Sequence, residues 1–439
     1  MDNSNNRYNF IFTIVLIWLP ILNIYSSGIV GLGLGDVLLL FVTAILIYHD
    51  KGIVVDKTGY WLFIIYLIAV SLILTLFISE YQLSETITKL AKMSLYAFII
   101  CQIARKHFLV ERGVLLYINT SFVASVYLLL QALLHITLGI YLPINLPFLR
   151  LASMEIGSTY YEAMISGYEV FGYRYSGFFM EPAQFCQYTV FAVILLLFLD
   201  ELHIQIKRKT TKLIIICLGI IISFSAMGYV LVLVVWFIWI LKKAKNVQSF
   251  LRKIATMIVG ITILVFVSLK TGAFTSMQAR MMGISGVGVS SGNMRLLRGF
   301  EIFNQEPFVF KIFGIGAGNF SAFMDHFNIA TRYDAYIPLN NEYMSGISTV
   351  LVYGGVIGLV LFTIPIIKAI KYNSFMTRTI MIILLLILFS SSSLISAVFT
   401  VPMAIVYALI PFFKEKTVLN TKRTDLESKT NFQLYTGSL

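Results

Sequence analysis

Residues 60–78 read YWLFIIYLIAVSLILTLFI, an uninterrupted apolar run without a charged side chain. A helix needs about 20 predominantly apolar residues to cross the hydrocarbon core of a bilayer, so this stretch predicts a transmembrane helix. The run at 343–367 has the same character. Of the 439 residues, 58% are hydrophobic and 12% charged, whereas soluble domains have about 45–50% and about 25%. The composition argues against a soluble globular chain and predicts an integral membrane protein.

Similar apolar runs recur along the chain and predict an all-α, polytopic transmembrane bundle of about twelve spans. The segment 213–241 lies between two basic clusters and is expected to break near Ser225–Gly228 into two short arms, the alternative being one long tilted helix. The first span lacks the small-residue cleavage site of a signal peptide and is expected to be retained. The expected spans are 10–25, 34–48, 60–78, 90–103, 114–140, 183–200, 213–226, 229–241, 254–269, 343–367, 378–395 and 398–413.

The basic residues predict the orientation of these spans. With the N-terminus in the cytoplasm, 23 of the 33 Lys and Arg residues fall on the cytoplasmic side and 10 outside, as the positive-inside rule requires. The net charge of +12 therefore serves membrane orientation and does not indicate nucleic-acid binding. We expect one transmembrane domain (1–413), a basic cytoplasmic tail (414–439), and two long outer loops (141–182 and 270–342). The three cysteines lie in apolar segments and predict neither a disulfide framework nor a metal site.

The first outer loop ends in GYRYSGFFMEPAQFCQY (172–188). A helix is expected to begin at the proline, with Glu181 beside its positive end, where capping alone would explain the carboxylate. Arg174 lies among aromatic residues that include Tyr173 and Tyr175. These rings suit either an interfacial belt or a platform for sugar rings. The arginine suits either a surface ion pair or a two-pronged grip on a phosphate.

The second outer loop contains NMRLLRGFEIFNQEP, beginning at Asn293. Asn293 predicts a helix N-cap, and the spacing of Arg295 and Arg298 puts both on one helical face. The structural alternative is that Glu301 and Glu306 pair with these two arginines.

Further along the second loop, GIGAGNF (314–320) predicts a tight turn with close backbone approach. His326 is the only histidine in either long outer loop, where an incidental role competes with a substrate contact. The two loops carry six arginines, including Arg280, but only two lysines. Arginine suits bidentate anion recognition, so the loops predict a phosphate-containing ligand, although binding of lipid headgroups would need the same residues.

At these residues the chain resembles the O-antigen polymerase and ligase superfamily of bacterial inner-membrane proteins. The resemblance covers about residues 170–365 and consists of an ordered set of motifs. These are R-x-x-G with E-P-x-x-F (Arg174, Gly177, Glu181, Pro182, Phe185), a Ser/Gly break (Ser223, Ser225, Gly228), the arginine helix (Arg295), G-x-G-x-G-N-F (Gly314, Gly316, Gly318, Asn319, Phe320), N-E-Y (Asn341, Glu342, Tyr343) and G-G-x-x-G-L (Gly354, Gly355, Gly358, Leu359).

The resemblance implies an enzyme that polymerises undecaprenyl-diphosphate-linked oligosaccharide repeat units of O-antigen or capsule at the outer face of the membrane. Donor and acceptor glycolipids, membrane lipid and a chain-length regulator protein are the implied partners, with no nucleic acid. Ligases of this superfamily usually have a His-Asn pair before the late span, where this chain has Asn340 and Asn341. This difference favours a polymerase over an O-antigen ligase or a protein O-oligosaccharyltransferase. A non-enzymatic flippase is the other alternative, and it predicts charges buried within the spans.

Cleavage of a sugar–diphosphate bond produces an anionic leaving group, so catalysis needs positive charge directed at it. Arginines supply that charge, and no cofactor, nucleotide or metal is expected. A carboxylate or His326 would serve as base for the acceptor hydroxyl. The expected catalytic residues are Arg174, Arg295, Glu181 and Glu342, and the expected substrate-binding residues are Arg298, Arg280, His326, Tyr173, Tyr175 and Asn341.

Overall fold

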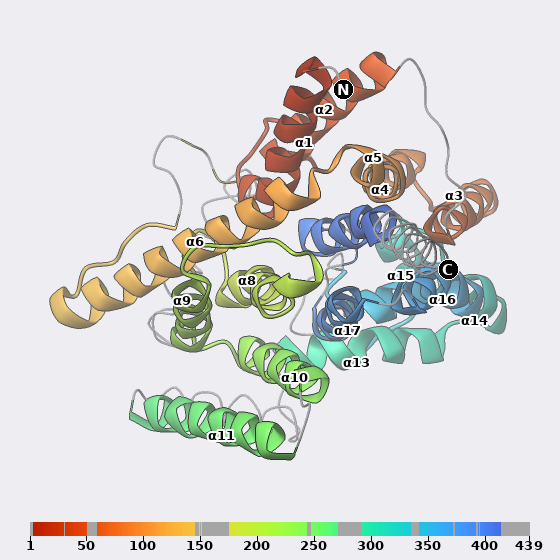
Figure 1. Cartoon of the computed structure of the whole chain (residues 1–439). Helices are drawn as coiled ribbons and strands as arrows, with labels where there is room; N and C mark the ends of the chain where they lie inside the picture. Colours follow the sequence, from red (N-terminus) through yellow and green to blue (C-terminus); the bar gives the residue numbers. More distant parts are fainter. Residues whose placement is uncertain are drawn as a thin grey trace, which may run out of the picture.

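A computed structural model of the chain describes residues 3–29, 31–50, 59–144, 149, 151, 175–243, 247–270, 291–334, 342–371, 374–391, 394 and 396–413. Within these ranges the regular structure is helical, as expected (Figure 1). Extended backbone pairs only in two isolated bridges, Tyr25 with Leu151 and Ser26 with Gly33.

Every one of the twelve apolar segments coincides with a helix. In the first half these are α1 (Asn3–Leu22), α2 (Leu34–Asp50), α3 (Gly59–Phe77), α4 (Leu83–Phe98), α6 (Val110–Leu138) and α8 (Pro182–Leu197), and the short α5 (Ala104–His107) lies between α4 and α6. The second half contributes α9 (Lys209–Ile222), α10 (Ala226–Lys243), α11 (Val247–Lys270), α16 (Gly346–Lys371), α17 (Phe375–Ser390) and a final helix at Ala397–Phe413. Three further helices lie between α11 and α16, namely α13 (Ser291–Gln305), α14 (Phe308–Phe313) and α15 (Phe320–His326).

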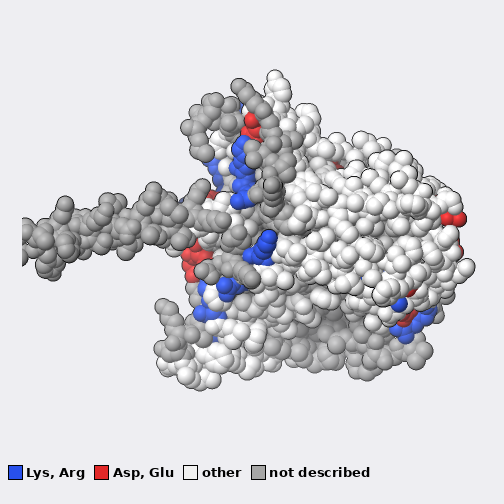
Figure 2. All heavy atoms as spheres, turned by 90° about the vertical axis from the view of Figure 1, so that its right-hand side faces the viewer, with Lys and Arg blue, Asp and Glu red and all other residues white. Residues whose placement is uncertain are grey.

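Four of the described helices are long and apolar enough, by length and composition, to cross a membrane: α3, the continuous α4–α5 helix, α6 and α16. Their large apolar side chains are partly on the surface, for example Leu76 at 84% and Phe77 at 82% exposed. On the face shown in Figure 2, charged side chains gather at two ends, and an uncharged zone separates them. Exposed apolar helices with charges at their ends indicate a membrane protein.

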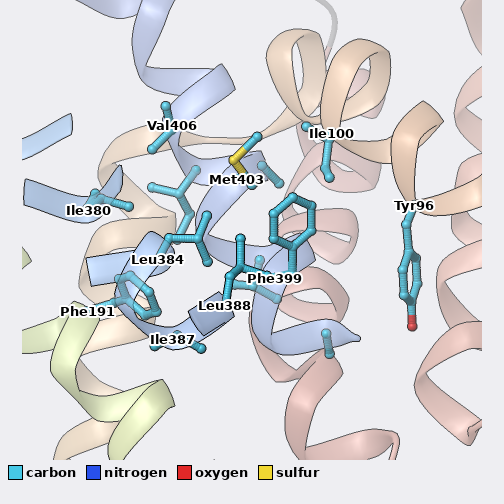
Figure 3. Packing of buried hydrophobic residues seen from close by; sticks show 14 of the residues in the cluster. Tyr96, Ile100, Phe191, Ile380, Leu384, Ile387, Leu388, Phe399, Met403 and Val406 are labelled. Atoms are coloured by element: carbon cyan, nitrogen blue, oxygen red, sulfur yellow. The ribbon is translucent and has the colours of Figure 1, made fainter. Parts of the chain in front are cut away.

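The helices pack around an apolar core that α17 crosses. Figure 3 shows Leu384 and Leu388 of α17 close to Phe191 of α8 and to Phe399 and Met403 of the final helix. All five side chains are at most 2% exposed. The core therefore joins α8 to helices that follow it by almost two hundred residues in the chain.

The expected break in 213–241 is confirmed. Helix α9 ends at Ile222 and α10 begins at Ala226, with Phe224 between them at φ 51°. A left-handed non-glycine residue cannot continue an α-helix, so the alternative of one long tilted helix is wrong.

Two predicted helix starts need correction. The fourth span was expected at 90–103, whereas α4 begins at Leu83 and runs through a π-helical turn (Ile99–Ile103) into α5. Polar residues on one face of this first part lower its hydropathy but do not interrupt the helix. Helix α13 begins at Ser291, so Asn293 lies inside its first turn and is not its N-cap.

Polar contacts sort the connections between helices into two ends of the bundle. At one end the contacts join loops predicted to lie outside: Glu80 with His326, Lys89 with Glu342 and Gln82 with Asn319. At the other end they join loops predicted to be cytoplasmic: Asp50 with Lys106 and His107, and Glu201 with Lys242 and Ser374. Each contact joins two connections that the sequence predicts on the same side of the membrane. The grouping therefore agrees with the predicted alternation of the connections between the two sides.

Candidate functional site

A cavity of about 560 Å³ opens at the end of the bundle formed by the loops that were predicted outside. Helix α4 forms one wall, and the loop before α2, the glycine-rich turn after α14 and the start of α16 form the others. Among the described residues, four charged side chains line it: Glu85, Lys89, Lys92 and Glu342. Sequence analysis had singled out only Glu342 of these.

Helix α4 aims its polar face into the cavity. Ser84, Glu85, Thr88, Lys89 and Lys92 all line it. Residues three and four apart lie on one face of a helix, so the nine residues from Ser84 to Lys92 can place all five side chains there. The sequence signal for these cavity residues is the polar stripe along 84–92. The expected span at 90–103 begins too late, so most of this stripe is assigned to a loop.

Lys92 is fixed by a buried carboxylate. Its ammonium forms an ion pair with Asp36 Oδ2 (3.0 Å) and donates a hydrogen bond to the carbonyl of Gly31 (3.2 Å). Asp36 is fully buried and also accepts from Asn23 Nδ2 (2.8 Å) and from the Tyr96 hydroxyl (2.6 Å). A buried carboxylate persists only where several donors compensate its desolvation. This network joins α1, α2 and α4 below the cavity.

Lys89 has a different environment. It forms an ion pair with Glu342, and the two side chains are 29% and 26% exposed. Its ammonium lies 5.9 Å from the centre of the Tyr353 ring. This pair therefore connects α4 to the segment before α16 at the cavity wall, and it is in contact with solvent.

Arg295 lies beside this segment. Its Nε donates to the Tyr343 hydroxyl (2.6 Å), and its guanidinium centre is 4.7 Å from the Tyr343 ring. The carbonyl of Arg295 accepts from the backbone N–H of Ser345 (2.6 Å). The stack holds α13 against the start of α16 and positions a guanidinium next to the residue that follows Glu342.

The glycine-rich turn approaches α16 backbone to backbone, which confirms the expected close approach. The N–H groups of Ile315 and Gly316 donate to the carbonyls of Val352 and Tyr353, both at 3.0 Å. These carbonyls are available because α16 is kinked at Gly355, whose φ is 61° and ψ −164°. The same turn continues to Gly318, which lines the cavity.

The other charged residues of α13 that the sequence singles out, Arg298 and Glu301, form ion pairs with other parts of the protein. Arg298 is fully buried, and its Nε and Nη2 lie 3.1 and 3.0 Å from Asp334 Oδ1. Glu301 pairs with Arg332 at 2.6 Å. The alternative that Glu301 and Glu306 pair with Arg295 and Arg298 is therefore wrong. A substrate contact by Arg298 stays a prediction, and it would require this burial to change.

Other predicted site residues lie apart from these contacts. Tyr175 is buried, and its hydroxyl is 2.9 Å from Nδ1 of His135 on α6. Glu181 precedes α8, as expected, but its side chain makes no capping hydrogen bond. His326 lies at the end of α15, with Nδ1 3.1 Å from Glu80 Oε2. Their proposed roles stay predictions. Four other residues fall outside the described part of the chain, namely Arg174, Tyr173, Arg280 and Asn341.

Glu306 is buried without compensation. Its side chain is 2% exposed, and neither carboxylate oxygen has a hydrogen-bond partner among the described residues. Burial raises the pKa of Glu306 to about 8, against the opposing charge of Lys311. Tyr81 is the other titratable group described as facing it. The carboxyl is therefore largely protonated at neutral pH in the folded protein.

This raised pKa predicts a loss of stability as pH rises. Between the ordinary pKa of 4.5 and about 8, the folded state keeps a proton that the unfolded state has lost, so the free energy of unfolding falls with pH. A shift of about 3.5 pH units corresponds to at most about 5 kcal/mol, and access of water brings the expected loss nearer 2 kcal/mol. Glu306→Gln should raise the melting temperature at pH 8 and change it little at pH 5. Glu301→Gln is the surface control, and an equal pH profile for Glu306→Gln and the unmodified protein would contradict the expectation.

Fold and site together define an all-helical protein with apolar helices of membrane-spanning length and a charged cavity at one end of the bundle. Comparison with protein families, curated proteins and solved structures found no match. The function is therefore inferred from the site.

Proposed function

We propose that the protein is a bacterial inner-membrane glycosyltransferase that polymerises lipid-diphosphate-linked oligosaccharide repeat units of O-antigen or capsule. The observation that carries the proposal is the meeting of separate motif segments at one end of the bundle. Arg295 stacks on Tyr343, Glu342 and Gly318 line one cavity, and the turn from Gly314 packs on α16. These residues belong to the motifs through which the sequence resembles the O-antigen polymerase superfamily.

The proposed chemistry transfers the donor glycan from its lipid diphosphate to a hydroxyl of the acceptor repeat. The sugar–oxygen bond to the diphosphate breaks, and the lipid diphosphate leaves with the bonding electrons. A guanidinium such as that of Arg295 stabilises this developing charge. Of the two carboxylates described at the cavity, Glu85 and Glu342, Glu342 belongs to a motif of the resemblance and is the proposed acceptor of the proton of the acceptor hydroxyl. The donor carries its own activation, so no nucleotide takes part.

A flippase of the same glycolipids is the second candidate, and one observation favours it. Asp36 of α2 is fully buried and forms an ion pair with Lys92 of α4. Buried charges within spanning helices are typical of transport pathways. Asp36 nevertheless lies in the first turn of α2, near the end of the bundle that carries the cavity, which agrees better with a binding site at one membrane surface.

Surface polysaccharide from a deletion strain distinguishes the candidates. Loss of a polymerase leaves a single capped repeat and no ladder on a gel. Loss of a ligase leaves lipid-linked polymer that is not transferred to its final acceptor, and loss of a flippase leaves lipid-linked repeats in the cytoplasmic leaflet. Either of the last two patterns would contradict the polymerase assignment.

Twelve spans with both termini in the cytoplasm complete the proposal. Single cysteines at two exposed positions test it: Asn328→Cys in the segment after α15 and Lys207→Cys before α9. A membrane-impermeant maleimide should label Asn328→Cys in intact spheroplasts and Lys207→Cys only after permeabilisation. The unmodified protein measures labelling of the native cysteines, two of which are buried. The reverse pattern would overturn the proposed orientation and the mechanism together.

A further inference from the structure

Neither lysine at the cavity belongs to the motifs that suggested the function. Lys89 and Lys92 extend from the same face of α4 into the cavity, where the other charged lining residues in the described part of the chain are Glu85 and Glu342. The two lysines and two glutamates have no net charge between them. Among these four residues, an ammonium becomes available to an anion when a carboxylate releases its lysine.

The two ion pairs differ in how readily they can exchange. Asp36 is fully buried, accepts hydrogen bonds from Asn23 and Tyr96 and forms an ion pair with Lys92, so displacing it from Lys92 would leave a buried charge without its counter-ion. Glu342 is 26% exposed and borders the cavity. Partly exposed ion pairs contribute little to stability. The Lys89–Glu342 pair is the one that a ligand can open.

Lys92 is already oriented for such a ligand. Its ammonium is held by the ion pair with Asp36 and by a hydrogen bond to the carbonyl of Gly31, and a lysine ammonium has three N–H donors in all. Lys92 also lines the cavity, and its position is fixed before any ligand arrives. Gly31 and Gly318 at the same cavity present no side chains that would obstruct a bulky anionic group.

We propose that Lys89 and Lys92 bind a diphosphate group in this cavity and that Glu342 is the exchangeable counter-ion that the diphosphate displaces from Lys89. This inference rests on the proposed function for the identity of the anion and assigns the residues that hold it. Displacement frees the Glu342 carboxylate at the moment the donor is bound. Binding of the donor and availability of the base are thereby coupled through one ion pair.

Binding to the purified, full-length protein in detergent tests this without requiring activity. The probes are farnesyl diphosphate, inorganic diphosphate and farnesol, measured by thermophoresis. Lys89→Gln should weaken binding of farnesyl diphosphate about 10-fold or more, because a charge-assisted hydrogen bond is lost. Glu342→Gln should strengthen it by about 3- to 10-fold, because the competing counter-ion is removed. Lys106→Gln, which neutralises an exposed lysine of another ion pair at the opposite end, should leave binding unchanged.

A purely structural ion pair would make the two variants change in the same direction, and that result would overturn the proposal. So would the absence of diphosphate binding, or binding of farnesol equal to that of farnesyl diphosphate. Lys89→Arg should keep the affinity within about 3-fold, since charge and donors are retained, and it remains informative if Lys89→Gln does not fold. Tighter binding of the farnesyl compound assigns the site to a lipid headgroup, and equal binding of inorganic diphosphate assigns it to diphosphate alone.

Failure of this inference is distinguishable from failure of the proposed function. Opposite effects of Lys89→Gln and Glu342→Gln on binding, with a normal polysaccharide ladder in the deletion strain, would keep the diphosphate site and exclude the polymerase. A lost ladder with no diphosphate binding would keep the polymerase and exclude this site.

Discussion

Arg295→Ala is expected to reduce polymerisation about 100- to 1000-fold, which corresponds to about 3–4 kcal/mol for loss of one donor to a developing anion. Arg295 reaches the cavity end from α13 and is held by its stack on Tyr343. Lysine keeps the charge but neither the planar stack nor the two-pronged geometry. Arg295→Lys should therefore be almost as impaired. The measurement is polysaccharide ladder length at matched protein levels in the membrane.

Arg332→Ala is the control for Arg295→Ala. Arg332 is 63% exposed and pairs with Glu301 on the surface of the same loop, so its removal should leave the ladder normal. A normal ladder from Arg295→Ala would refute the assigned role, and a near-normal ladder from Arg295→Lys would reduce it to charge attraction. Arg174, which lies outside the described residues, is expected to behave like Arg295 because it occupies the other arginine motif of the resemblance.

Gly355→Ala is expected to prevent accumulation of folded protein. Gly355 has φ 61° and ψ −164°, a combination open almost only to glycine. A Cβ there would also overlap the carbonyl oxygen of Ile312 and the backbone N of Gly314. Backbone strain of about 1–3 kcal/mol and overpacking of about 1–3 kcal/mol together approach the total stability of many domains. Protein level in the membrane and the melting temperature in detergent measure the effect.

Substitutions at two other glycines distinguish backbone strain from steric overlap as the cause of the effect. Gly354→Ala changes the neighbouring residue, where the nearest side-chain atom to a new Cβ is 3.5 Å away, in Leu67, and it should be tolerated. Gly139→Ala has a left-handed backbone (φ 67°) but open space around it, so only the backbone cost of about 1–2 kcal/mol applies. Equal accumulation of Gly355→Ala and Gly354→Ala would show that the packing of the glycine turn on α16 is not required for folding.

The folding of this turn explains why the two glycine motifs occur together. A kink at Gly355 exposes carbonyls of α16, and the turn after α14 supplies the N–H groups that satisfy them. In a bilayer, unpaired backbone groups are costly. The sequence predicts that the backbone at 314–320 approaches another segment closely. Only the packing of the helices determines that this segment is α16.

The sequence by itself determined the helices and their breaks. Apolar runs of bilayer length, Pro182 at the start of α8 and the Ser/Gly break before α10 all act within a few residues, so local patterns record them. It failed at the start of α4, where polar residues on one face reduced the mean hydropathy of a segment that is nevertheless helical.

Only the tertiary structure decided which charged groups meet. Lys89 and Glu342 are 253 residues apart, and neither local sequence indicates the other. The same holds for Arg298, which pairs with Asp334 in a buried position, and for Glu306, which is buried without a partner among the described residues. A charge at a given position is compatible with solvent, an ion pair or a ligand, and packing between distant helices fixes which of these applies. The cavity is the result of that packing, because α4, the glycine turn and the start of α16 contribute one wall each.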